Sequence, residues 1–223
     1  ITLEDLAYFG MDFRKDYSHP GVAPFQPTVG KYTDNYILML STSKAFSYAG
    51  ERCAVLGISN KLAERRYPDL KEFCGQDIFA RGIIFGALHP LSSGTSHSAQ
   101  YAVAGVMKAV NDGTYNYRDD VLEYGEKAKM MKDAFTSNGF KFTYDEDLGE
   151  PIADGFYFTY YYPGFTGAEL LEKMLYYGIS AISLDTCGST RQGIRACTSL
   201  IQRDEIPVLA ERLKRFAEDH PIK

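Results

Sequence analysis

The residues best suited to do chemistry lie in the segment from Ser41 to Arg52. Lys44 follows an apolar run and small hydroxyl residues, so we expect its amine to be partly buried. Burial disfavours the charged form of an amine and makes it a nucleophile toward a carbonyl group. Arg52 comes eight residues later and could bind a phosphate through two hydrogen bonds. Pyridoxal phosphate requires such a lysine and such an arginine. The alternative is a surface lysine in a loop, with Arg52 in a salt bridge.

Two residues near the start of the chain could act on the same cofactor. Asp5 lies at the end of the expected opening strand, and its carboxylate could hold a protonated pyridine nitrogen. Tyr8 follows three residues later and could donate a hydrogen bond to the phenolic oxygen of the ring. By themselves, these two residues are better explained as a polar strand end with a tyrosine on the surface.

Arg195 lies inside an apolar segment that we expect to be a strand over 194–198. An unpaired guanidinium there would be costly, so the side chain needs an anion. Either a nearby acidic residue forms a structural ion pair with it, or it binds a substrate carboxylate through two hydrogen bonds.

The elements that must position these residues follow from hydrophobic periodicity and from residues that end helices. We predict strands over 36–40, 53–58, 155–162, 179–182 and 194–198, and helices over 76–87, 96–110, 118–137, 166–177 and 203–219. The pair His89-Pro90 should end the first of these helices. Lys127 should lie on the solvated face of the helix over 118–137. A buried face of the strand over 155–162 should carry Phe156, Phe158, Tyr160 and Tyr162.

Length and composition indicate a folded protein with a sizeable core. The chain has 223 residues, of which 45% are hydrophobic and 24% charged, close to the globular average. The order of the predicted elements indicates an α/β part followed by an α+β part. We therefore predict two domains, 1–112 and 113–223.

Charge and cysteine usage exclude several classes of partner. A net charge of −5 without a basic run argues against nucleic acid. No stretch reaches the ~18 apolar residues of a membrane span. The four cysteines lack the C-x-x-C spacing of a zinc site, so we expect no metal. Without a recognisable leader, they indicate buried, reduced thiols in a cytoplasmic protein.

Taken together and in order, Asp5-x-x-Tyr8, Ser41-x-x-Lys44, Arg52 and Arg195 resemble a known family. The family is the fold-type I aminotransferases of class I/II, which depend on pyridoxal 5'-phosphate and include the aspartate aminotransferase-like enzymes. The resemblance covers the whole chain but only the C-terminal half of the family's chain. It implies that residues 1–112 are the rear half of the large cofactor domain and that 113–223 are the small C-terminal domain.

The resemblance also implies a role for each matched residue that would touch the cofactor. Lys44 would form the Schiff base with pyridoxal phosphate and later carry the α-proton. Asp5 would pair with the pyridine nitrogen, and Tyr8 would donate to the phenolic oxygen. Ser41 and Arg52 would bind the phosphate.

For the substrate, the resemblance implies that Arg195 binds the α-carboxylate. The reaction would move an amino group between an amino acid and a 2-oxo acid, and the full-length protein would be a homodimer. Alternatives that use the same cofactor are a carbon–sulfur lyase, a decarboxylase and a cyclopropane-carboxylate synthase-like enzyme. A further alternative is the effector-sensing domain of a transcription regulator.

Parts of the family's pattern have no counterpart in this sequence. The glycine-rich phosphate loop and the aromatic residue that stacks on the cofactor ring precede the position of Asp5 in the family. The sequence opens at Ile1, without methionine and inside an expected strand. We therefore expect a fragment of a longer protein that is inactive alone.

Overall fold

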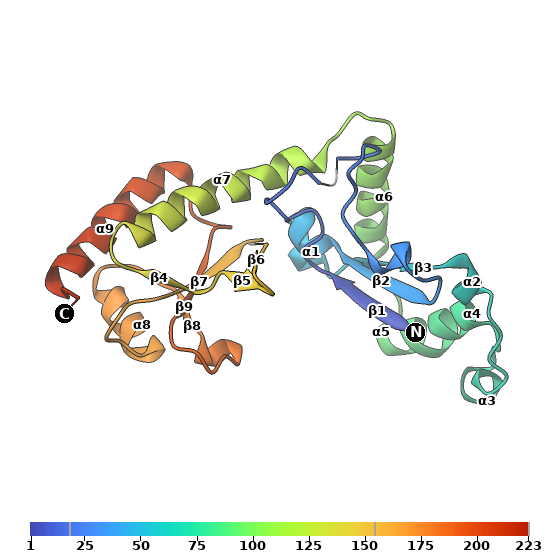
Figure 1. Cartoon of the computed structure of the whole chain (residues 1–223). Helices are drawn as coiled ribbons and strands as arrows, with labels where there is room; N and C mark the ends of the chain where they lie inside the picture. Colours follow the sequence, from blue (N-terminus) through green and yellow to red (C-terminus); the bar gives the residue numbers. More distant parts are fainter. Residues whose placement is uncertain (18, 154, 223) are drawn as a thin grey trace. The chain divides into compact units, whose positions relative to one another are not determined.

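The computed structural model describes residues 1–17, 19–153 and 155–222, which form two compact units (Figure 1). The first unit consists of Ile1–Gly10 and Asp16–Asp120, and the second of Met11–Lys15 and Val121–Lys223. The units divide between Asp120 and Val121, inside a helix. The predicted domain boundary after residue 112 stays a prediction.

A three-stranded sheet with the order β1-β2-β3 forms the centre of the first unit. Its strands are β1 (Thr2–Leu6), β2 (Tyr36–Ser41) and β3 (Ala54–Ile58), so the predicted strands over 36–40 and 53–58 are present. β1 and β2 are parallel, and Leu6 pairs with Leu40. β3 is antiparallel to β2, and Ser41 pairs with Ala54.

The first unit also contains short helices and one longer helix. They are α1 (Thr42–Ala45), α2 (Asn60–Ala63), α3 (Leu70–Cys74), α4 (Phe79–Ile83), α5 (His89–Ser92) and α6 (His97–Asn111). A π-helical stretch, Ile84–Leu88, joins α4 to α5. The predicted helix end at His89-Pro90 is wrong. Pro90 lies in the first turn of α5, where a helix does not need the missing N–H group, and the chain stays helical to Ser92.

The second unit contains an antiparallel sheet with the order β4-β7-β9-β8. Its strands are β4 (Lys141–Tyr144), β7 (Tyr157–Tyr161), β8 (Ile182–Ser183) and β9 (Ile194–Cys197). A separate small hairpin pairs β5 (Glu146–Asp147) with β6 (Glu150–Pro151). The strand predicted over 179–182 is largely wrong. The N–H of Ile179 donates to the carbonyl of Met174 (3.0 Å), so this segment still closes the preceding helix.

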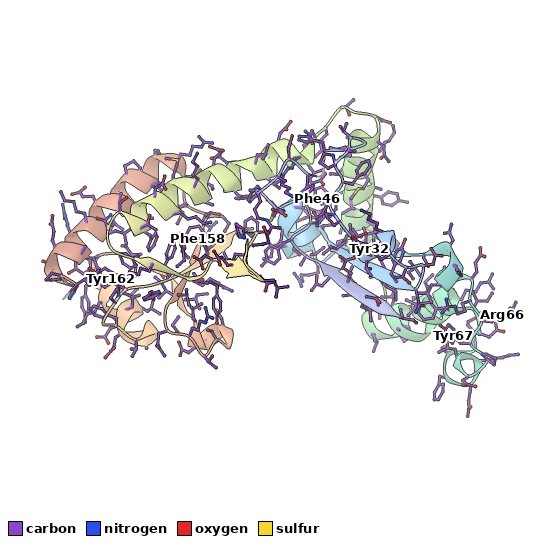
Figure 2. The ribbon with its side chains drawn as sticks, in the orientation of Figure 1. Tyr32, Phe46, Arg66, Tyr67, Phe158 and Tyr162 are labelled. Carbon is purple, nitrogen blue, oxygen red and sulfur yellow. The ribbon has the colours of Figure 1, made fainter. Side chains whose placement is uncertain are left out.

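Helices α7 (Tyr117–Thr136), α8 (Gly167–Tyr176) and α9 (Ile206–Asp219) confirm the predicted helices in this half of the chain. Their apolar residues join those of β7 and β9 in one buried core. The predicted alternation along 155–162 is confirmed, since the even-numbered aromatic residues are buried and those at 157 and 161 are only half-buried. Figure 2 labels two of the buried aromatic side chains, Phe158 and Tyr162.

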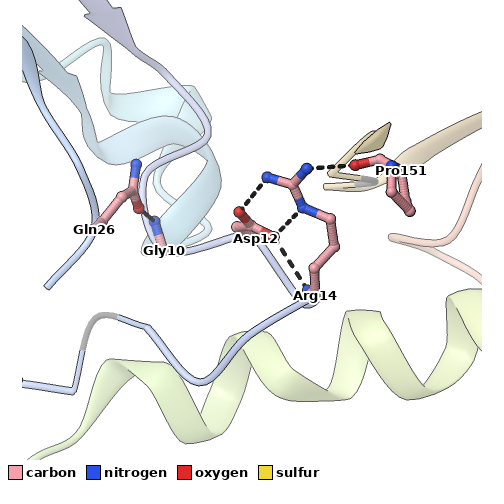
Figure 3. Close-up of polar contacts among 5 residues, drawn as sticks. All are labelled: Gly10, Asp12, Arg14, Gln26 and Pro151. Carbon is pink, nitrogen blue, oxygen red and sulfur yellow. Dashed lines mark hydrogen bonds and ion pairs between the residues drawn. The ribbon is translucent and has the colours of Figure 1, made fainter. Parts of the chain in front are cut away.

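The segment Met11–Lys15 packs against the rest of the second unit through three of its side chains. Met11 is buried against Val121 and Phe156. The guanidinium of Arg14 donates two hydrogen bonds to the carboxylate of Asp12 (2.9 and 2.7 Å) and one to the carbonyl of Pro151 (Figure 3). The Phe13 ring lies so close to Gly125 of α7 that a Cβ at that position would overlap it.

Two expectations about single side chains are wrong. Lys127 is buried, because the polypeptide after β9 crosses over it and the carbonyl of Ile201 accepts a hydrogen bond from its Nζ (2.8 Å). Cys187 and Cys197 are exposed rather than buried, although all the cysteines are free thiols. Cys187 lies in an exposed 3₁₀ turn, and Cys197 ends β9 on the face opposite the core.

In the part of the chain that the structure describes, no helix has the length and apolar character needed to cross a membrane. Among the same residues, no group of three or more His, Cys, Asp or Glu side chains is arranged to hold a metal ion.

Candidate active site

Three segments that carry predicted site residues meet at one edge of the β1-β2-β3 sheet. β1 and β2 are parallel, so their carboxyl ends, at Leu6 and Ser41, lie side by side. β3 runs the other way, so its first residue, Ala54, lies beside Ser41. This edge lies at the end of the sheet near α1 (Figure 1). The carboxyl ends of parallel strands are where open α/β sheets bind ligands.

The lysine-bearing turn is anchored on both sides. Ser41 caps α1 through its Oγ, which accepts a hydrogen bond from the N–H of Ser43 (3.2 Å). Thr42 is fully buried, and its Oγ1 donates to the carbonyl of Cys53 (2.6 Å). These contacts hold Lys44 in α1, directly after the end of β2. The lysine is half-buried, as its position in the sequence predicted.

Lys44 and Tyr8 lie close together at this edge. The Nζ of Lys44 is 5.9 Å from the centroid of the Tyr8 ring, within the range of a cation–π contact. The two residues are far apart in the sequence, and the parallel pairing of β1 with β2 brings them together. The structure therefore places the predicted nucleophile beside the predicted hydroxyl donor.

Asp5 lies on β1, one residue before its end, and is exposed. Its Oδ1 accepts a hydrogen bond from the N–H of Ala7 (2.9 Å). This contact fixes the carboxylate at the turn that leads to Tyr8. Asp5 pairs with Met39 of β2, so it lies on the same parallel strand pair as the lysine-bearing turn.

Arg52 precedes β3 and is exposed. Its backbone is left-handed (φ 51°), which is uncommon for a residue other than glycine, and one guanidinium nitrogen donates to the carbonyl of Ala49 (2.8 Å). Ser47, in the same loop, is also left-handed (φ 50°). Such strain collects at ligand-binding turns. A Cβ at Gly50 would meet no atom within 4 Å, so the backbone there is open to a ligand.

Arg195 belongs to the second unit and lies on β9. The guanidinium carbon is 4.2 Å from the centroid of the Tyr157 ring. Within residues 1–17, 19–153 and 155–222, no carboxylate forms an ion pair with Arg195, and the side chain is half-buried. The structural ion pair considered as an alternative is therefore not present among these residues.

The set of side chains at the sheet edge matches the chemistry of pyridoxal phosphate. An amine, a carboxylate, a phenol, a hydroxyl and a guanidinium come from Lys44, Asp5, Tyr8, Ser41 and Arg52. They supply a group that can condense with an aldehyde, an acceptor for a protonated ring nitrogen, and donors for oxygen and phosphate.

Sequence reasoning missed two residues that support this arrangement. Thr42 anchors the lysine-bearing turn, and its only sequence signal is a hydroxyl residue directly after an apolar strand. Tyr157 stacks on Arg195, and its signal is its position on the less buried face of the aromatic strand. In both cases the contact depends on how neighbouring strands pair, so pattern alone could not identify it.

No protein-family model and no curated protein matches this sequence. Solved structures do match it. A protein from Escherichia coli with a methionine aminotransferase function is 15% identical, and the alignment covers 96% of this chain and 49% of that chain with a TM-score of 0.66. An aminotransferase from Mycobacterium tuberculosis is 14% identical over 98% and 49% of the two chains (TM-score 0.67). An aspartate aminotransferase from Thermotoga maritima is 15% identical over 97% and 47% (TM-score 0.64).

These matches establish the fold. The chain has the α/β fold of aminotransferases and spans about half the length of the solved structures that it matches. The predicted resemblance to the C-terminal half of a fold-type I aminotransferase is confirmed as a likeness of fold. Identities near 15% show the fold and leave the activity to be inferred from the site.

Proposed function

We propose that this chain is the C-terminal part of a pyridoxal-phosphate-dependent aminotransferase, which moves an amino group between an amino acid and a 2-oxo acid. One observation carries the proposal. Lys44 and Tyr8 lie together at the sheet edge where the site-bearing ends of all three strands of the first unit meet. The aminotransferase fold of the matched structures supports it.

Each residue at the edge has a distinct part in this proposal. Bound pyridoxal phosphate would supply an electron sink for the bonds of the substrate α-carbon. The Nζ of Lys44 would bind the cofactor and, once a substrate amine has taken its place, would carry the proton at the α-carbon. The carboxylate of Asp5 would keep a proton on the ring nitrogen, and the Tyr8 hydroxyl would donate to the ring oxygen. Ser41 and Arg52 would bind the phosphate.

Arg195 would bind the α-carboxylate of the amino acid or the 2-oxo acid. A guanidinium matches a carboxylate through two parallel hydrogen bonds, which orients the substrate as well as binding it. A homodimer of the full-length protein and a cytoplasmic location belong to the same proposal.

Covalent trapping of the cofactor tests this assignment directly. The chain is incubated with pyridoxal phosphate, reduced with borohydride and digested, and the modified lysine is identified by mass spectrometry. Trapped product accumulates with time, so the experiment detects even weak binding by the chain alone. We expect the label on Lys44, and its loss in Lys44→Ala.

Lys173→Ala is the matched control. The Nζ of Lys173 also lies 5.8 Å from a tyrosine ring, that of Tyr176, but both residues are on the exposed face of α8 in the second unit. The control should label Lys44 as the wild type does. Label spread evenly over surface lysines, with no change in Lys44→Ala, would refute the proposed site.

A further inference from the structure

Arg195 lies in the middle of a row of residues that crosses the second sheet. The register joins Tyr144 to Thr159, Thr159 to Arg195, and Arg195 to Ile182. Residues paired in this way point to the same face, which is the face opposite the buried core. The four strands of this sheet have the sequences KFTY (β4), YFTYY (β7), IS (β8) and IRAC (β9). These strands contain one lysine and one arginine but no acidic residue. The face is therefore suited to an anion.

The Tyr157 ring is the protein partner of Arg195. The guanidinium carbon lies 4.2 Å from the ring centroid, which is the distance of a close stack. In the part of the chain that the structure describes, the guanidinium forms no hydrogen bond or ion pair with the protein. A stacked ring contacts the flat face of a guanidinium, whereas all of its N–H groups point outward in the plane. The stack thus orients the charge and leaves its hydrogen-bonding edge available.

Arg191 shows the contrasting arrangement in the same unit. Its guanidinium carbon lies 4.7 Å from the centroid of the Tyr144 ring. One of its terminal nitrogens, however, donates to the carbonyl of Thr143 (2.8 Å). Part of the hydrogen-bonding edge of Arg191 is therefore occupied by the protein backbone. The contact of Tyr144 with Arg191 provides a matched control for the contact of Tyr157 with Arg195.

We propose that Tyr157 is a positioning residue for carboxylate binding. Its ring holds the guanidinium of Arg195 in one plane, so that less side-chain freedom is lost when a carboxylate binds the exposed edge. The inference rests on the proposed role of Arg195 in binding a substrate carboxylate, and it adds the residue that prepares Arg195 for that role. The ring performs this function and the phenol hydroxyl does not.

A titration with pyruvate, followed by NMR of the Nε–H group of Arg195, tests the inference without requiring turnover. The variants are Tyr157→Leu, Tyr157→Phe and the control Tyr144→Leu, with Arg195→Lys to assign the resonance. We expect Tyr157→Leu to raise the Kd for pyruvate about 5-fold, the value of a partly desolvated cation–π contact. Tyr157→Phe keeps the ring and should stay within about 2-fold of the wild type, as should Tyr144→Leu.

A purely structural role for Tyr157 would lower the unfolding temperature and leave the Kd unchanged. That result overturns the inference, and so does the absence of pyruvate binding to the wild-type chain. Equal effects of Tyr157→Leu and Tyr144→Leu also overturn it. The Lys44 trapping experiment is independent of Tyr157. If Lys44 is labelled but pyruvate binding is not weakened by Tyr157→Leu more than by Tyr157→Phe and Tyr144→Leu, only the inference about Tyr157 is refuted. If Tyr157→Leu weakens pyruvate binding as expected but Lys44 is not labelled, only the proposed function is refuted.

Discussion

Gly193 immediately precedes the strand that carries Arg195, and its replacement by alanine should strongly destabilise the second unit. The residue has a φ of 141°, which side chains other than hydrogen rarely tolerate. A Cβ there would overlap the backbone carbonyl of Tyr160 and lie 2.7 Å from Oγ1 of Thr143. The Gly193 carbonyl also accepts a hydrogen bond from the N–H of Leu184 (2.9 Å), so the backbone cannot move away without losing that bond.

The size of the effect follows from these two costs. Backbone strain at such a φ costs about 1–3 kcal/mol. Overlap with a rigid backbone atom in a packed sheet adds about 1–3 kcal/mol. A combined loss of about 3 kcal/mol corresponds to a fall in unfolding temperature of about 12 °C or more for a unit of this size.

Gly188→Ala separates the two costs. Gly188 has a φ of 82°, but a Cβ at that position would meet no atom within 4 Å. Gly188→Ala should therefore be destabilised only by the backbone strain, about 1–2 kcal/mol, with a correspondingly smaller fall in unfolding temperature. Thermal unfolding followed by circular dichroism measures both variants. Equal falls for Gly188→Ala and Gly193→Ala would refute the argument that the close packing at Gly193 holds β9 in place.

Two further predictions concern contacts described above. Thr42→Val removes the buried hydrogen bond to the Cys53 carbonyl. It should therefore lower the unfolding free energy by about 1–2 kcal/mol and reduce borohydride trapping on Lys44. Thr42→Ser keeps the hydroxyl and should behave like the wild type in both measurements. Two hydrogen bonds from Arg203 (2.8 and 2.7 Å) hold the pKa of the Glu123 carboxyl below its usual value. The contact therefore stabilises the folded chain above about pH 4.3 and is lost as the pH falls through the lowered pKa. Denaturant unfolding of Glu123→Gln should show a small loss at pH 6 that shrinks as the pH is lowered, and a loss that grows toward low pH would contradict this sign.

The local sequence determined the elements whose signals lie within a few residues. The apolar run of β2, the period of α6 and α7, and the alternation from Phe156 to Tyr162 all depend on neighbouring side chains. Local signals failed at two positions, for different reasons. Pro90 would end a helix in isolation, but it lies in the first turn of a new one. Lys127 follows a solvated pattern, but a distant carbonyl covers it.

The same division holds for the candidate site. The residue types and the step from Lys44 to Arg52 were readable from the sequence, since they lie within one strand–turn–strand segment. The sequence alone did not show that β1 runs parallel to β2, which brings Tyr8 beside Lys44. Nor did it show that β3 runs antiparallel to β2, which brings the start of β3 beside Ser41. The stack of Tyr157 on Arg195 likewise depends on the register between β7 and β9. Strand direction and register are set by contacts between segments far apart in the chain, and only the tertiary structure contains those contacts.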